Sequence, residues 1–190
     1  MKNLFLLLIF LFSITLSNSQ TQSMQKIWQV YQQANQIRTQ NTTSDYYIVE
    51  QNHTLPDIGQ QKLSYKIYFE TVLNDNIDKP FEQIVTIVEK KFNQSKNNFS
   101  EEYLFDKNSN LLYFQRKENF GANREFRFYF KDKYAESLTI SYFDEQTGKK
   151  LQKIENYTMQ QINQKFADML EYSKNEASRI LNIFNTLKIY

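Results

Sequence analysis

The 190-residue chain is close to neutral, with 23 Lys and Arg residues against 21 Asp and Glu residues and a formal net charge of +2. Nucleic-acid binding usually involves a basic stripe or a clearly basic domain, and the sequence has neither, so we expect no nucleic-acid partner. The chain has no cysteine, which excludes a disulfide framework and argues against structural zinc. Burial alone must stabilise it, and a chain of this length removes roughly 70% of its unfolded surface from water.

The first 19 residues have the parts of a secretory signal peptide. Lys2 and the amino terminus supply a short positive region, and residues 4–16 are almost entirely apolar. This apolar run is 13 residues long, whereas a helix that crosses a bilayer needs roughly 20. We therefore expect a signal peptide at residues 1–19 and no transmembrane segment in the mature chain.

The leader ends in a small-x-small cleavage site. Ser17 and Ser19 occupy its −3 and −1 positions, so the mature protein is expected to begin at Gln20 and to form a single α+β domain over residues 20–190. Small secreted eukaryotic domains usually carry disulfides. The cysteine-free chain therefore favours an exported bacterial envelope protein, either periplasmic or extracellular.

Residues 24–38 show the spacing of an amphipathic helix, with Ser23 placed to cap its first turn. Its apolar side chains are Met24, Ile27, Trp28, Tyr31 and Ala34.

After this helix the hydrophobic period changes to two, and Tyr, Ile, Val and Phe dominate. The pattern is clearest in residues 126–130, where three phenylalanines alternate with Arg127 and Tyr129. Alternation places the phenylalanine rings on one sheet face and the polar tips on the other. Strands are expected at residues 45–51, 62–73, 82–92, 100–106, 111–118, 124–131 and 137–144.

Polar turns follow the aromatic ends of these strands. Residues 142–151 run from Tyr-Phe-Asp through Gly148 to Leu151, and weaker echoes of this segment begin at Tyr103 and Tyr129. Asp and Asn bond their own backbone in such turns, and Gly accepts a positive φ. We therefore expect hairpins that form an antiparallel meander.

The last segment has the strongest helical pattern. Thr158 and Gln161 form a capping box, and apolar residues then step by three or four from Ile162 to Leu187. We expect one long helix, bent near residues 173–175. The predicted fold class is α+β: an antiparallel meander sheet of six or seven strands packed against an N-terminal helix and a long C-terminal helix, with both helices on one sheet face.

Residues 142–151, together with the leader and the C-terminal helix, resemble small secreted Gram-negative bacterial proteins of unknown function that carry a Tyr-Phe-Asp-x-x-Gly-x-Leu style of hairpin meander. The chain departs from this pattern at Ser109, where a glycine would be expected. The resemblance implies a location and a fold but no activity.

Sequence signals for catalysis, metals and cofactors are weak. His53 is the single histidine and is placed in the loop between the first two strands; without cysteine it does not make a zinc site. Three glycines give no phosphate-binding loop. An acid/base pair would have to be assembled from different strands, such as Glu70 with Glu118. We assign no catalytic residue, no metal and no cofactor, and the question of enzymatic activity stays open with the balance toward a non-enzyme.

The sheet face opposite the helices is the candidate binding surface, because Tyr and Arg on a rigid surface give large contact areas with polar tips. The candidate binding residues are Lys66, Tyr68, Tyr113, Arg127 and Tyr129. We interpret the chain as a non-enzymatic module for an envelope protein or a small ligand. Two alternatives stay open: a hydrolase-type enzyme with carboxylates from different strands, and a structural subunit that docks through its C-terminal helix. The sequence assigns neither the ligand nor an oligomeric state.

The cleavage site gives the first testable prediction. Intact-mass measurement of the protein recovered from a cell-envelope fraction should give the mass of a chain that begins at Gln20, because Ser17 and Ser19 fit the small pockets of a signal peptidase. A mass that includes residues 1–19 would contradict the predicted leader.

Overall fold

The computed structural model describes residues 24–36, 38–39, 45–55, 59–73, 80–94, 97–118 and 123–188. The expected leader, the expected start at Gln20 and the expected cap at Ser23 lie outside these residues. Within the described part of the chain, no helix combines the length and the apolar character that crossing a membrane requires.

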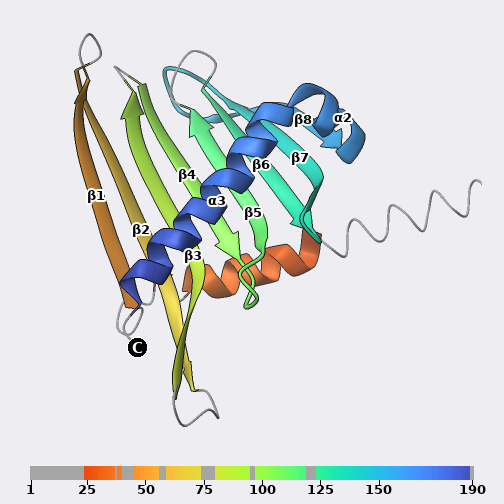
Figure 1. The fold of residues 1–190 in the computed structure, drawn as a ribbon. Helices are drawn as coiled ribbons and strands as arrows, with labels where there is room; N and C mark the ends of the chain where they lie inside the picture. Colours follow the sequence, from red (N-terminus) through yellow and green to blue (C-terminus); the bar gives the residue numbers. More distant parts are fainter. Residues whose placement is uncertain are drawn as a thin grey trace, which may run out of the picture.

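One antiparallel sheet runs through the molecule in meander order, so that each strand pairs with its neighbours in the chain (Figure 1). Its strands are β1 (Asp45–Leu55), β2 (Gly59–Leu73), β3 (Phe81–Gln94), β4 (Asn97–Phe105), β5 (Leu111–Glu118), β6 (Arg124–Lys131), β7 (Tyr134–Phe143) and β8 (Lys150–Thr158). The expected meander is confirmed, and the sheet gains β8 as an edge strand. The sequence pattern missed β8 because most of its side chains are exposed and give no alternation.

The helices are the N-terminal helix, seen at residues 24–36 and 38–39, then α2 (Met159–Lys165) and α3 (Ala167–Leu187). The α+β class is thus confirmed. The expectation that both helices cover one sheet face is wrong: α3 crosses one face diagonally, and the N-terminal helix packs on the other (Figure 1).

The face under α3 holds the larger core. On β6, Phe126, Phe128 and Phe130 are buried in it, so the predicted separation of the phenylalanines from Arg127 and Tyr129 is confirmed. The helices contribute Ile162, Leu170, Ala177, Ile180 and Phe184. Stacking of α3 on a continuous aromatic surface explains why its apolar stripe is so regular.

The opposite face holds a smaller core under the N-terminal helix. Ile27 and Ala34 from the helix are buried together with Tyr68, Ile87, Leu104 and Tyr113 from β2 to β5. Consecutive residues of one strand are therefore buried on different faces, as Tyr103 and Leu104 are in β4. A strand covered on both faces reads as a continuous hydrophobic run.

The C-terminal helical segment breaks at Phe166 and not at the predicted bend near residues 173–175. Phe166 has φ −132° and ends α2, and its ring packs edge-on against Tyr157 with centroids 4.9 Å apart. Ser173 instead lies buried within α3, where its hydroxyl donates to the Leu170 carbonyl at 2.8 Å. The capping box is confirmed, since the Thr158 N–H donates to Gln161 Oε1 at 2.9 Å.

Three hairpin turns depend on positive φ. Gly148 has φ +66°, as its predicted turn requires, and Ser109 has φ 62° at the position where the hairpin pattern would place glycine. Asp132 and Lys133 have φ 48° and 73°. Positive φ at both central residues is typical of a type I′ turn, whose twist matches the flanking strands β6 and β7.

Truncation of the α3 core should destabilise the protein strongly. Ile180 is fully buried, so Ile180→Ala should lower the free energy of unfolding by about 2 to 5 kcal/mol, the usual range for emptying a buried large side chain. Chemical denaturation monitored by circular dichroism measures the change. Asn185→Ala, at an exposed position of the same helix, is the matched control, and equal denaturation midpoints for the two variants would contradict this packing.

The β7–β8 edge should lose stability in acid through Glu155. Hydrogen bonds from Tyr157, Lys153 and Tyr142 lower the pKa of Glu155 from its ordinary value of 4.5 to about 2. A carboxylate with a lowered pKa stabilises the fold above its unfolded pKa, and this contribution disappears as the pH falls toward the folded value. Glu155→Gln should therefore melt below wild type at pH 6, and the difference should shrink between pH 4.5 and 2. A difference in melting temperature that is constant over this range would contradict the assignment.

Candidate functional site

Antiparallel pairing arranges the sheet face under the N-terminal helix in three rows of side chains that run across the strands. The aromatic row contains Tyr68, Ile87, Leu104, Tyr113 and Tyr129. The first polar row contains Lys66, Glu89, Glu102, Gln115, Arg127 and Thr139. The second polar row contains Lys91, Ser100, Lys117, Glu125 and Ser141.

All five predicted binding residues lie on this face. Three of them belong to the aromatic row, where the rings of Tyr113 and Tyr129 are 5.4 Å apart. Lys66 and Arg127 belong to the first polar row, but three strands separate them, and Lys66 Nζ lies 4.8 Å over the Tyr68 ring. The structure therefore brings Tyr113, Arg127 and Tyr129 together and leaves Lys66 and Tyr68 apart from them.

The expectation that this face is free of helices is wrong. Tyr68 and Tyr113 are only 3% and 5% exposed because the N-terminal helix packs on the aromatic row. Tyr31 of the helix meets Tyr113 edge-on, with ring centroids 5.6 Å apart. The two polar rows extend beyond this contact. The helix therefore covers the aromatic row and forms a wall along one side of the two polar rows.

A cavity of about 410 Å³ lies between this wall and the polar rows. Tyr31 and Arg38 line it from the helix, and Glu89, Glu102 and Gln115 line it from β3, β4 and β5. Lys117, Glu125 and Arg127 line its other side. The lining thus combines acidic, basic and neutral polar side chains from four strands and one helix.

Arg38 organises the helix side of this cavity. Its Nη1 donates to Glu89 Oε1 at 2.8 Å and to Glu102 Oε2 at 2.7 Å, which ties the helix to two neighbouring strands. Burial, together with the Glu102 carboxylate, raises the pKa of Tyr31 from its ordinary value of 10 to about 12, so its hydroxyl stays protonated well above neutral pH.

Arg127 and Glu125 form the opposite side. They pair with each other, and Glu125 also accepts from Gln115 Nε2 at 3.2 Å and faces Lys117 Nζ at 3.4 Å. Burial opposes protonation of Arg127, but the Glu125 carboxylate together with Tyr113 and Tyr129 outweighs it, so that the pKa of Arg127 rises above its ordinary value. The guanidinium therefore remains charged in a half-buried position.

Three buried polar atoms in this lining have no hydrogen-bond partner among the described residues: Glu102 Oε1, Glu125 Oε1 and Arg127 Nε. Glu125 Oε1 nevertheless pairs with the Arg127 guanidinium, which leaves Glu102 Oε1 and Arg127 Nε. Buried polar atoms are normally satisfied, and leaving one unpaired costs roughly 1 to 3 kcal/mol. An acceptor on β4 and a donor on β6 are thus left unpaired within side chains that line the cavity. The sequence analysis identified Arg127 but missed Arg38, Glu89, Glu102 and Glu125. The three glutamates could have been found as charged residues at strand positions whose side chains point toward the covered face.

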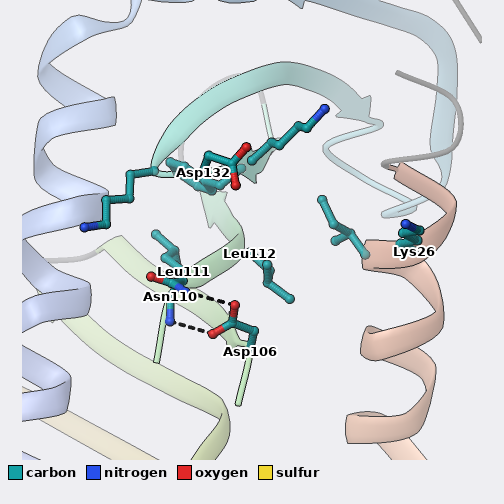
Figure 2. Close-up of a pocket in the computed structure, with 10 residues that line it drawn as sticks. Lys26, Asp106, Asn110, Leu111, Leu112 and Asp132 are labelled. Carbon is teal, nitrogen blue, oxygen red and sulfur yellow. Dashed lines mark hydrogen bonds between the residues drawn. The ribbon is translucent and has the colours of Figure 1, made fainter. Parts of the chain in front are cut away.

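A larger cavity, of about 570 Å³, lies between the turns at the other end of the N-terminal helix (Figure 2). Figure 2 shows that Asp106 is bonded to Asn110. Asp106 also accepts from the Asn108 N–H at 2.9 Å. Its carboxylate is therefore occupied in holding its own turn, and the cavity makes a weaker case for a site than the cavity over the polar rows.

A second charged cluster is buried under α3. Lys90 Nζ lies 3.3 Å from Glu101 Oε2 and 3.0 Å from Glu176 Oε1, and it donates to the Tyr172 hydroxyl at 2.8 Å. Tyr65 donates to Glu176 at 2.5 Å. Burial, followed by the hydrogen bond with Glu176, raises the pKa of Tyr65 above its ordinary value. The cluster is closed and mutually satisfied, so we assign it a structural role in fixing α3 on the sheet.

The carboxylate pair named from the sequence does not form. Glu118 contacts Arg116 and Arg124 at the end of β5 and lies level with Leu63 of β2 through the strand register. Glu70 lies seven residues further along β2, a separation of roughly 20 Å at the usual rise of a strand. His53 is also placed differently: it is an exposed residue within β1 and not a loop residue.

Within the described ranges, no group of three or more His, Cys, Asp or Glu side chains has an arrangement that could hold a metal ion. No protein-family model, curated protein or solved structure matches the chain. Function is therefore inferred from the geometry of the cavity over the polar rows.

The buried cluster under α3 gives a stability prediction. Lys90→Ala leaves Glu101 and Glu176 buried without the cation between them, so it should lower the free energy of unfolding by about 3 to 5 kcal/mol. Lys91→Ala, at the next residue but exposed on the opposite face, should change it by no more than about 0.5 kcal/mol. Urea denaturation of both variants decides, and similar midpoints would contradict the structural role of Lys90.

Proposed function

We propose that the protein is an exported, non-enzymatic module that binds a polar ligand in the cavity between the N-terminal helix and the two polar rows. The observation that carries this proposal is the pair of unsatisfied buried atoms, Glu102 Oε1 and Arg127 Nε, in the lining of a cavity of about 410 Å³. A ligand with an acceptor and a donor at matching positions relieves both once the two side chains turn toward it. Polar groups that converge on a preformed cavity fix the orientation of a ligand in small-molecule sites.

The rigidity of the lining supports binding. Arg38 is held by two carboxylates and Glu125 by three neighbours, so these side chains have lost most of their rotamer freedom before a ligand arrives. Preorganised groups gain affinity because less conformational entropy is lost on association.

A hydrolase is the second candidate function, since Glu89 and Glu102 come from different strands and meet in the same cavity. Their oxygens, however, both contact Arg38 Nη1, which occupies the space between the two carboxylates. A substrate placed between the two carboxylates for acid/base catalysis would have to displace this guanidinium. The pair is therefore better suited to holding Arg38 than to acid/base catalysis.

Docking through α3 has less support. Leu170, Ala177, Ile180 and Phe184 are buried against the sheet of the same chain, so the apolar stripe that suggested a structural subunit is already occupied.

The proposal predicts localised binding. When the protein is screened by two-dimensional NMR against amino acids, nucleotides and sugars, the amide signals that shift should belong to the polar rows of β3 to β6. Arg127→Ala should weaken binding of a hit by about 2 kcal/mol, roughly thirtyfold, because arginine anchors contribute on this scale. Lys107→Ala, at an exposed turn position, is the matched control.

Two outcomes would count against the proposal. Hits whose shifts map to the turns of the larger cavity, with Arg127→Ala binding as tightly as wild type, would remove the polar rows as the site. Hydrolysis of a bound compound by the wild-type protein, but not by the Glu89→Gln variant, would favour the hydrolase.

A further inference from the structure

Along the N-terminal helix, the cavity over the polar rows is followed by a second cavity, of about 520 Å³. Trp28, Gln29 and Gln32 line it from the N-terminal helix, and Tyr129 lines it from β6. Tyr129 lies two residues from Arg127 on the same face of β6, so the floor of the second cavity adjoins the floor of the first. The two cavities share one flank of the helix.

Helical spacing places the key residues of both cavities in line. Trp28, Tyr31 and Arg38 are three and seven residues apart, so they project from the same side of the helix. The span from Trp28 to Arg38 is about 15 Å at 1.5 Å per residue. This length suits an extended chain of several units better than a single small molecule.

Trp28 is an unusual residue at this end. It is 52% exposed, although a large aromatic ring is normally buried. Its ring is nevertheless fixed, because it stacks on Tyr31 with centroids 5.2 Å apart and planes at 12°, and Tyr31 rests on the buried Tyr113. The result is a flat, rigid and accessible aromatic surface.

The groups around this surface are polar but not of one charge. Exposed Gln25, Gln29 and Gln32 surround Trp28, and Gln115, Glu102 and Arg127 line the charged cavity. Amide, carboxylate and guanidinium groups are planar and bond two neighbouring atoms at once. Adjacent hydroxyls of a sugar ring present such pairs, and the ring's C–H face stacks on an aromatic ring.

Other ligand classes fit less well. A polyanion would meet the carboxylates of Glu89, Glu102 and Glu125, and a polycation would meet Arg38 and Arg127. A strongly apolar ligand would leave these charged groups desolvated and unpaired.

We propose that the two cavities form one binding groove for a neutral oligosaccharide, with one sugar ring stacked on Trp28 and others hydrogen-bonded over the polar rows. This inference rests on the proposed binding function and names its ligand class.

Trp28 is the only tryptophan in the chain, so intrinsic fluorescence reports directly on the stacking position. The probes are cellohexaose, maltohexaose and chitohexaose as neutral hexamers, with hexagalacturonate and a Gly-Ser hexapeptide as charged and peptide comparisons. At least one neutral hexamer should change the Trp28 emission saturably, and glucose should bind at least tenfold more weakly.

Calorimetry of variants then tests the contacts. Trp28→Ala should weaken binding of that hexamer at least tenfold while melting close to wild type. Gln115→Ala should weaken it as much at a temperature where the variant is folded, although loss of its hydrogen bonds with Tyr113 and Glu125 lowers its melting temperature. Phe81→Ala removes an aromatic ring of comparable exposure, 62%, at the far β2–β3 hairpin, and should bind like wild type.

The outcomes separate this inference from the proposed function. If only hexagalacturonate or only the peptide changes the Trp28 emission and shifts the NMR signals of the polar rows, the assignment of a neutral oligosaccharide is wrong. The proposed binding function would then still hold. Binding of a neutral hexamer that is unchanged in Trp28→Ala would overturn the joined groove. No change in Trp28 emission with any neutral hexamer would overturn the inference. No chemical-shift change in the polar rows with any compound of the NMR screen would overturn the proposed function as well.

Discussion

The strand register of the meander is the constraint on which the rest of the structure depends. Because neighbouring strands are antiparallel and in register from β2 to β7, side chains of one parity line up across the sheet in rows. An aromatic row gives the N-terminal helix a surface to pack on, and the two polar rows beside it become the floor of a cavity. A slip of one residue in a single strand would move that strand's side chains to the opposite face and interrupt all three rows.

The two helices use this register in different ways. The helix α3 buries an apolar stripe and encloses the satisfied cluster around Lys90, so its face is closed. Among its described residues, the N-terminal helix buries only Ile27 and Ala34, and its Arg38 bonds across to Glu89 and Glu102. One face therefore provides stability, and the other carries the charged groups that we propose bind a ligand.

Local patterns predicted much of this fold. The alternation in residues 126–130, the capping box at Thr158 and the turn at Gly148 depend on neighbours in the chain, and all three are confirmed. The side on which the N-terminal helix packs depends on contacts far apart in sequence, between Tyr31 and Tyr113 for example. Local alternation also predicted the face on which Arg127 and Tyr129 lie. The contact between Arg38 and Glu102 joins residues far apart in the chain, so no local pattern predicted it.

The seat of the N-terminal helix on the aromatic row is the central claim, and proton–proton contacts measured by NMR test it most directly. The account predicts nuclear Overhauser effects between the ring protons of Tyr31 and Tyr113, whose centroids are 5.6 Å apart. It predicts none between Tyr31 and Phe184, which lies on the face under α3. Contacts from Tyr31 to Phe184, or a Tyr31 ring without contact to Tyr113, would contradict the arrangement from which the groove follows.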